Sequence, residues 1–281
     1  MGSGIAQATA TAGLATVVRD VSEAALRQGE AAVRSSLDRL ADKGKIDRAT
    51  RDGALARLAW TTTLPDLAGC DLIVEAVPED ASLKRALWRE LEPHCSPATI
   101  FASNTSSLSI TELAADTGRA DRFVGLHFFN PVPLMPLVEV VRGLATSAET
   151  FDAAVAFVRR LGKEPIAARD RAGFIVNRLL VPYLLDAVRA LEQGTASVSD
   201  IDRGMQLGAG HPMGPFALLD FVGLDTMLSI GEIMFQEYRE PRFAPPALLR
   251  RMVAAGLHGR KSGRGFYDYS SDRPHPSDIA L

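Results

Sequence analysis

The sequence is poor in cysteine and has no long apolar run. Cys70 and Cys95 are the only cysteines among 281 residues, and neither has a Cys or His neighbour at metal-ligand spacing. We therefore expect two reduced, mostly buried thiols and no metal site. No apolar run approaches the roughly 20 residues of a membrane-spanning helix, and the N-terminus lacks a basic and then apolar signal pattern. These absences favour a cytoplasmic location and no membrane partner.

Basic residues are not in excess either. The formal net charge is -3, and no basic block is longer than a pair such as Arg260–Lys261. This charge distribution argues against a nucleic-acid partner and against binding to an anionic membrane surface. The 47% hydrophobic and 23% charged content is ordinary for a soluble globular protein of one large or two ordinary domains. Small-molecule chemistry is the function class that remains favoured.

The N-terminal residues are rich in glycine and alanine. Residues 1–8 are expected to begin a helix whose small residues let a sheet or a ligand approach closely. Residues 15–20 are expected to form a short buried strand that ends in Asp20. In a dinucleotide-binding unit, an acid at this place accepts hydrogen bonds from the adenosine ribose and disfavours a 2′-phosphate. The alternative for Asp20 is a turn or helix-cap role shared with Ser22.

Apolar positions recur at helical spacing from about residue 22 to residue 58, with an interruption at Gly44. The pattern predicts a helical hairpin inserted after the strand that ends in Asp20. Lys43, Lys45 and Arg48 would form a small basic tip on this hairpin. The tip could meet a phosphorylated substrate, or it could be a solvated helix end.

Strands and helices alternate from there to about residue 169. Strands are expected over 71–79, 98–103, 123–129, 137–141 and 164–168, and helices over 83–91 and 149–161. The alternation predicts a doubly wound α/β domain over 1–169, with ligand-binding loops at the strand ends of an open parallel sheet. Polar residues 104–107 follow one of these strands.

The pattern becomes helical near residue 170. Helices are expected over 174–191, 199–207, 215–221, 224–238 and 245–255, which predicts a second, all-helical domain over 170–270. Residues 271–281 are rich in Ser, Asp and Pro, and we expect them to form a flexible tail.

The stretch from Gly125 to Val141 carries the clearest chemical signal. His127 lies at the end of one apolar run, and Glu139 lies in the next run across a proline-rich turn. Such a pair could meet as a base and its orienting partner. The alternative is a buried, satisfied histidine packed beside phenylalanines, without a catalytic role.

Several motifs in order along the chain point to one protein family. They are Ser103–Leu108, Gly125–Pro131, Val138–Val140, Asp170–Arg178, His211–Pro215 and Gly259–Tyr267. Together they resemble the L-3-hydroxyacyl-CoA dehydrogenase family, in the style of its bacterial 3-hydroxybutyryl-CoA dehydrogenases. The resemblance covers nearly the whole chain.

The resemblance implies an NAD-dependent oxidoreductase that interconverts the 3-hydroxyl of an (S)-3-hydroxyacyl-CoA thioester and the 3-oxo group. It implies a Rossmann-type domain with NAD as cofactor, followed by a helical domain through which two copies form a homodimer. It also implies an acyl-CoA substrate and a place in fatty acid metabolism.

The resemblance also implies roles for individual residues. His127 matches the family's general base and Glu139 its partner, while Ser106 and Asn177 match residues that contact the substrate near the reacting carbon. The implied cofactor contacts are Gly2, Asp20, Glu79, Lys84, Ser106, Asn130 and Lys261. Ser36 and Lys43 fall at the CoA-binding positions of the helical insert.

The chain departs from the family at its first residue. The family begins with a strand and a Gly-x-Gly-x-x-Gly turn, whereas Gly2 matches only the third glycine of that turn. Because the turn cradles the pyrophosphate and the strand is central, we expect their absence to expose strand edges and weaken NAD binding. We expect the natural protein to begin about ten residues upstream, the length of one strand and its turn.

Two other functions compete with the dehydrogenase. A catalytically silent structural or binding homologue would be compatible with the missing N-terminal turn. A dehydrogenase of free β-hydroxy acids would want a catalytic lysine in the helical domain, and the helix around Asn177 offers none.

Overall fold

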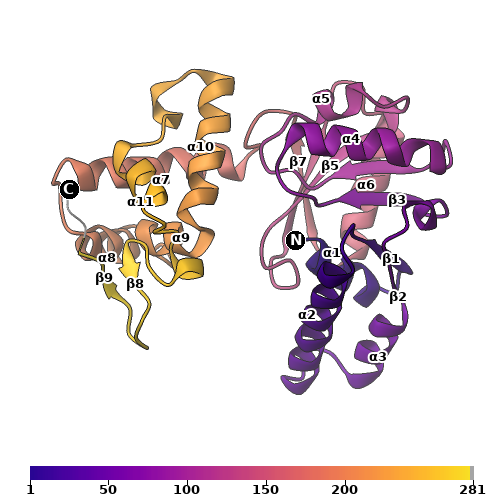
Figure 1. Ribbon diagram of the computed structural model, residues 1–281, viewed down its shortest axis with the longest axis horizontal. Helices are drawn as coiled ribbons and strands as arrows, with labels where there is room; N and C mark the ends of the chain where they lie inside the picture. Colours follow the sequence, from indigo (N-terminus) through magenta and orange to yellow (C-terminus); the bar gives the residue numbers. More distant parts are fainter. Residues whose placement is uncertain (279–281) are drawn as a thin grey trace. The chain divides into compact units, whose positions relative to one another are not determined.

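Strands and helices alternate along Met1–Phe174, the first of two units into which the chain divides (Figure 1). This computed structural model describes residues 1–278. The helices of the first unit are α1 (Gly2–Thr11), α2 (Glu23–Asp42), α3 (Arg48–Ala56), α4 (Ala81–Leu91), α5 (Ile110–Ala115) and α6 (Ala148–Arg160). Its strands are β1 (Thr16–Arg19), β2 (Leu58–Thr61), β3 (Leu72–Glu75), β4 (Ile100–Ser103), β5 (Phe123–Phe128), β6 (Leu137–Arg142) and β7 (Glu164–Arg169).

The larger sheet has the order β3-β4-β5-β6-β7. Strands β3, β4 and β5 are parallel, β6 runs antiparallel to β5, and β7 is parallel to β6. The parallel arrangement expected at the ligand-binding edge holds for β3, β4 and β5, whereas β6 and β7 run in the opposite direction. Residues 129–136 explain the difference, because a parallel crossover needs about a dozen residues or more and this connection is shorter.

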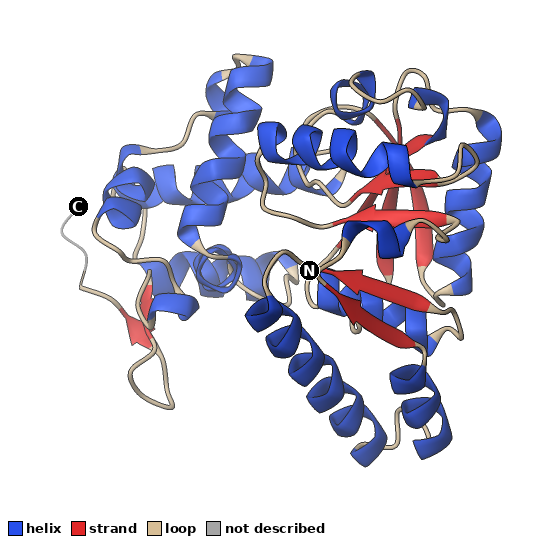
Figure 2. Ribbon diagram, turned by 45° about the vertical axis from the view of Figure 1, so that its right-hand side comes forward, coloured by secondary structure: helices blue, strands red, loops and turns tan. Residues whose placement is uncertain are grey.

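Strands β1 and β2 form a separate parallel pair, which Figure 2 shows apart from the five-stranded sheet. Among the strands of residues 1–278, β1 is hydrogen-bonded only to β2, and β3 only to β4. The strands of the first unit thus form two pieces, and β1 and β3 each end one of them.

Two apolar clusters lie on opposite faces of the five-stranded sheet. Phe101 and Phe123 pack with Trp88 of α4 in one cluster, while their neighbours Ala102 and Val124 belong to the other. Because successive side chains of a strand point to opposite faces, this split shows that both faces are covered. Helix α6 packs on β5, β6 and β7 within the second cluster.

The helical hairpin predicted for residues 22–58 is confirmed as α2 and α3. Ser22 caps α2 by accepting the N–H of Ala25, and Asp47 caps α3 by accepting the N–H of Thr50. Gly44 has a φ of +64°, the left-handed backbone that lets the chain turn after α2. Both cysteines are free; Cys95 is buried and Cys70 is half-buried.

The boundary between the units lies later than the predicted 169/170. The first unit ends at Phe174, whose side chain belongs to the cluster around Trp88. Asp170 is also held in this unit, where it accepts hydrogen bonds from the Ser109 hydroxyl and from the N–H groups of Ile110 and Thr111. These contacts keep residues 170–174 with the first unit.

The second unit begins at Ile175 and is built mainly from helices. They are α7 (Val176–Glu192), α8 (Val198–Ala209), α9 (Pro215–Val222), α10 (Leu224–Tyr238) and α11 (Ala247–Ala254). Its core joins Leu184, Phe216, Met234, Leu249 and Phe266. Within residues 1–278, no helix is both long and apolar enough to cross a membrane.

The segment predicted as a flexible tail is partly ordered. Strand β9 (His275–Pro276) pairs antiparallel with β8 (Tyr267–Asp268), and the N–H of Ser277 donates to the carbonyl of Phe266. The predicted tail also includes residues 279–281, which lie outside the described residues.

Candidate active site

His127 and Glu139 meet across two neighbouring strands. They are directly opposite each other in the antiparallel register of β5 and β6, and His127 Nδ1 lies 2.6 Å from Glu139 Oε2. Both side chains are buried, with 8% and 1% of their surface exposed. A carboxylate accepts only, so the proton between them belongs to Nδ1 and leaves Nε2 as the basic nitrogen of the neutral ring.

Aromatic rings flank the imidazole of His127. The Phe129 ring centroid lies 4.5 Å away and that of Phe174 lies 5.6 Å away. Phe174 has a φ of +45°, a conformation that is unusual for a bulky residue and is often found at functional sites. His127 Nε2 has no hydrogen-bond partner among the described residues. The ring is therefore held at Nδ1 by Glu139, and Nε2 can accept a proton from a ligand.

The loop after β4 is tied to the strand that carries His127. The Asn104 side-chain oxygen accepts the N–H of Phe128 at 2.9 Å, and the Asn104 N–H donates to the Glu75 carbonyl. Since β3, β4 and β5 are parallel, their carboxyl ends meet at one edge of the sheet. Ser106 and His127 accordingly lie at the same edge.

Glu79 organises this loop. Its Oε1 accepts the Thr105 hydroxyl at 2.6 Å, the Ser106 N–H at 2.8 Å and hydroxyl at 3.2 Å, and the Ser107 N–H at 3.1 Å. Burial would raise the pKa of Glu79, but the Thr105 hydrogen bond and the charge of Lys84 outweigh it, so the pKa lies below its usual value. The carboxylate is therefore ionised at neutral pH and holds the Ser106 backbone in place.

Lys84 is a buried cation between two carboxylates. Its ammonium lies 2.6 Å from Glu75 Oε1 and 3.3 Å from Glu79 Oε2, and its side chain is 1% exposed. Glu75 also accepts the Ser103 hydroxyl at 2.7 Å and the Val77 N–H at 2.8 Å. Glu75 was not singled out from the sequence, although an acid inside an apolar strand was a visible signal.

The first unit offers groups that fit NAD. The first N–H groups of a helix have no partner within the helix, so the start of α1 at Gly2 can receive a phosphate. A Cβ on Gly2 would lie 3.8 Å from that of Ala76, which puts the start of α1 beside the end of β3. Asp20 uses Oδ1 to accept the N–H of Ser22, and its Oδ2 has no donor among the described residues.

Two predicted ligand contacts line one cavity. Ser36 of α2 and Asn130, which precedes a cis proline, both face a cavity of about 170 Å³. Lys43 caps the C-terminal end of α2 and is exposed. Seven residues are almost two turns of helix, so Ser36 and Lys43 lie on one face of α2 about 10 Å apart along its axis.

Asn177 and Lys261 belong to the second unit. Asn177 is half-buried in the first turn of α7. The Lys261 ammonium forms an ion pair with Asp225 at the start of α10. The two side chains are thus placed within their own unit.

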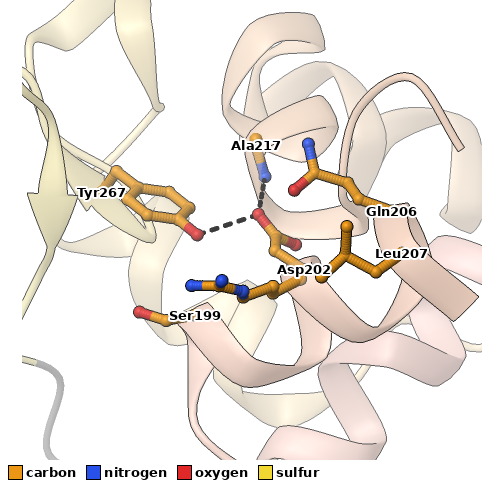
Figure 3. A pocket seen from close by; sticks show the side chains of 7 residues that line it. Ser199, Asp202, Gln206, Leu207, Ala217 and Tyr267 are labelled. Atoms are coloured by element: carbon orange, nitrogen blue, oxygen red, sulfur yellow. Dashed lines mark hydrogen bonds between the residues drawn. The ribbon is translucent and has the colours of Figure 1, made fainter.

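The second unit also holds a cavity of about 480 Å³, shown in Figure 3. Its buried carboxylate, Asp202, accepts the N–H groups of Phe216 and Ala217 and the Tyr267 hydroxyl at 2.7, 3.0 and 2.9 Å. Burial raises the pKa of Asp202 and of Tyr267. Because these bonds cap the first turn of α9, the carboxylate has a structural task. Among residues 1–278, no group of His, Cys, Asp or Glu is placed to hold a metal ion.

Family comparisons cover almost the whole chain. Residues 1–171 match the family described as 3-hydroxyacyl-CoA dehydrogenase, NAD binding domain. Residues 173–269 match 3-hydroxyacyl-CoA dehydrogenase, C-terminal domain.

Individual relatives match this chain over most of their own length. The chain is 47% identical over 271 residues to a 3-hydroxybutyryl-CoA dehydrogenase of Mycobacterium tuberculosis, covering 96% of this chain and 95% of that protein. It is 47% identical over 276 residues to the mitochondrial hydroxyacyl-coenzyme A dehydrogenase of Mus musculus, covering 96% and 88%. The crystal structure of (S)-3-hydroxybutyryl-CoA dehydrogenase from Ralstonia eutropha is 50% identical, covers 96% of each chain and has a TM-score of 0.92.

Proposed function

The chain belongs to the 3-hydroxyacyl-CoA dehydrogenase family, and from this premise we propose that His127 and Glu139 form its proton-transfer centre. The chain is an NAD-dependent dehydrogenase that interconverts 3-hydroxyacyl-CoA and 3-oxoacyl-CoA. The observation that carries the proposal is the buried 2.6 Å contact between Nδ1 and Oε2.

His127 Nε2 takes the proton of the substrate 3-hydroxyl as the carbon–hydrogen bond of the same carbinol carbon breaks. When bound, NAD supplies the acceptor for the hydride. Glu139 holds the ring in the tautomer that leaves Nε2 basic, and its negative charge stabilises the imidazolium that forms. In the reverse direction the imidazolium returns the proton to the 3-oxo oxygen.

Ser106 and Asn177 are proposed to hydrogen-bond the substrate oxygen as its charge changes. A well-placed donor of this kind typically contributes about 10²-fold or more in rate. Ser106 is supported by the hydrogen bonds of its backbone and hydroxyl to Glu79, which fix the loop at the carboxyl end of β4. The proposed role of Asn177 is supported by the motif Asp170–Arg178, in which it lies.

NAD is proposed to bind at the carboxyl edge of the strands. Asp20 would accept the ribose hydroxyls, and Gly2 would lie against the pyrophosphate. Glu79, Lys84, Ser106, Asn130 and Lys261 complete the proposed cofactor contacts. For Lys84 this contact would come through the loop that it helps to fix, because its ammonium is already buried between Glu75 and Glu79.

The acyl-CoA is proposed to meet α2 through Ser36 and Lys43. A serine and an exposed lysine on one helix face suit the polar, phosphate-bearing end of CoA. Binding energy from this remote part would position the thioester for reaction.

We further propose a homodimer formed through the second unit, a cytoplasmic location and a role in fatty acid metabolism. The dimer is supported by exposed apolar side chains on the helices of that unit, with Leu179 72% and Leu207 75% exposed. The location is supported by the two free thiols, which suit a reducing compartment.

Oxidation of NADH in the presence of acetoacetyl-CoA tests the proposal directly. We expect turnover by the purified chain and its near-complete loss in His127→Gln. Turnover that survives this substitution would show that another group transfers the proton.

A further inference from the structure

A cavity of about 170 Å³ lies between α1, α2 and the turn after β5. It is lined by Met1, Ser3, Gly4, Gln7, Ala32, Val33, Ser36, Asn130, Pro131, Val132 and Pro133. The Lys163 ammonium holds the turn by donating to the carbonyls of Val132 and Met135 at 2.6 and 2.7 Å. The walls of the cavity are therefore fixed by the fold of the first unit alone.

Gln7 is the buried polar side chain of this cavity. It is 3% exposed, and its side-chain amide has no hydrogen-bond partner among the described residues. Its amide atoms are not among the fully buried side-chain atoms that lack a partner, so the little exposure that remains is toward the cavity. The side chains of Ser3, Ser36 and Asn130 in the same lining are also without a partner in the described part of the chain. The cavity thus presents several unused donors and acceptors at once.

The side chains of the lining favour a neutral group that both donates and accepts hydrogen bonds. No side chain of the lining is charged, and the one charge beside it is the Met1 α-ammonium, whereas Gln7 and Asn130 each offer an N–H donor and a carbonyl acceptor. Val33, Val132 and Pro133 supply apolar walls. The volume is below the roughly 300–1,000 Å³ of a pocket for a whole drug-sized ligand, so the cavity suits one segment of a larger molecule. A carboxamide flanked by carbon atoms satisfies these conditions.

We propose that Gln7 pairs with a carboxamide of a bound ligand in this cavity. The proposal rests on the proposed function, which brings two sources of such a group: the pantetheine arm of the acyl-CoA and the nicotinamide of NAD. Ser36 and Asn130 line the cavity together, although the family resemblance gives the first to CoA and the second to NAD. Gln7 donates its N–H to the carboxamide oxygen and accepts the carboxamide N–H.

The variant Gln7→Met tests this assignment, with Gln28→Met as the matched control. Met is close to Gln in length and helix propensity, and Gln28 is exposed on α2. Titration calorimetry would measure the Kd values of CoA and NADH. Two further probes lack the relevant amide: adenosine 3′,5′-bisphosphate lacks the pantetheine arm, and reduced 3-acetylpyridine adenine dinucleotide lacks the amide nitrogen.

We expect Gln7→Met to weaken one ligand about 5- to 150-fold, the effect of losing two hydrogen bonds of about 0.5–1.5 kcal/mol each. A loss for CoA but not for the bisphosphate supports the pantetheine arm. A loss for NADH that is smaller for the acetylpyridine analogue supports nicotinamide. Unchanged Kd values for both ligands would overturn the proposal.

The melting temperature separates this role from a structural one. Since the Gln7 amide has no partner within the described chain, the melting temperature of Gln7→Met should equal or exceed that of the unsubstituted chain. A lower melting temperature with equal weakening of both ligands, or failure of both Gln7→Met and Gln7→Leu to fold, would also overturn the proposal. Lack of NADH oxidation by the unsubstituted chain would instead count against the proposed function. The Kd values, which do not depend on turnover, would still test the role of Gln7.

Discussion

His127 is the single residue on which the proposed proton transfer depends. We expect His127→Gln to lower kcat about 10²- to 10⁴-fold, because an amide can bond to Glu139 but cannot take the substrate proton. The KM for acetoacetyl-CoA should change little. His94→Gln is the matched control, since His94 is exposed in a short helix. Equal kcat values for the two variants would refute the assignment of the base.

Glu139 makes a separate prediction as the partner of His127. Glu139→Gln removes the negative charge opposite the imidazolium and can place an N–H donor against Nδ1. We expect kcat to fall about 10- to 100-fold, the usual range for losing a hydrogen bond to a charged group, with KM nearly constant. Glu90→Gln, at an exposed position of α4, should be neutral in the same steady-state assay. A variant with normal kcat would leave Glu139 with a packing role only.

Single residues were predictable from the sequence where their partner lies in the next strand. His127 and Glu139 were paired by their place in two apolar runs, and the short turn between β5 and β6 brings them into register. Glu75 and Gln7 were missed for a physical reason. The partners of Glu75 come from α4 and β4, and the burial of Gln7 depends on α2 and the turn after β5. No local pattern reports such contacts.

At the scale of elements, Glu79 ties the end of β3 to the loop after β4. Its pKa is lowered below the ordinary 4.5, so its stabilising effect is full above that value and is lost as the pH falls through the lowered pKa. We therefore expect Glu79→Gln to lower the free energy of unfolding by about 1–3 kcal/mol at neutral pH, relative to the unsubstituted chain. The difference should shrink in acid.

Denaturant titrations of the unsubstituted chain and of Glu79→Gln would measure the difference in free energy of unfolding at neutral pH and again at a pH below the ordinary pKa of 4.5. Glu90→Gln again serves as the control, because its side chain is exposed and should change neither value. A difference that stays constant or grows toward acid would contradict an ionised, loop-holding Glu79.

Most elements were predictable because their caps and periodicity are local, as in the hairpin of α2 and α3. Strand β2 and helix α5 were not predicted. Strand β2 spans Leu58–Thr61 and is defined by its pairing with β1. Helix α5 spans only Ile110–Ala115, and its first N–H groups are capped by Asp170, some sixty residues away. Both elements depend on partners distant in sequence.

At the scale of the whole molecule, the change from an α/β to a helical pattern was predictable, but its boundary was not. The predicted boundary follows the last strand, where the sequence pattern changes. The structure divides after Phe174, because the hydrogen bonds of Asp170 and the packing of Phe174 retain the connecting residues. Contacts of this kind, rather than periodicity, decide which unit a linker joins.

The proposed homodimer makes the prediction that belongs to the molecule as a whole. Light scattering after gel filtration should give twice the mass of one chain. Leu207→Asp in α8 should shift the protein toward monomers, by roughly a hundredfold in dissociation constant, since a two-fold interface buries the new charge twice. Leu144→Asp is the matched control, because Leu144 is 91% exposed in the first unit. A monomeric parent chain, or dissociation by Leu144→Asp alone, would exclude an interface built on the helical unit.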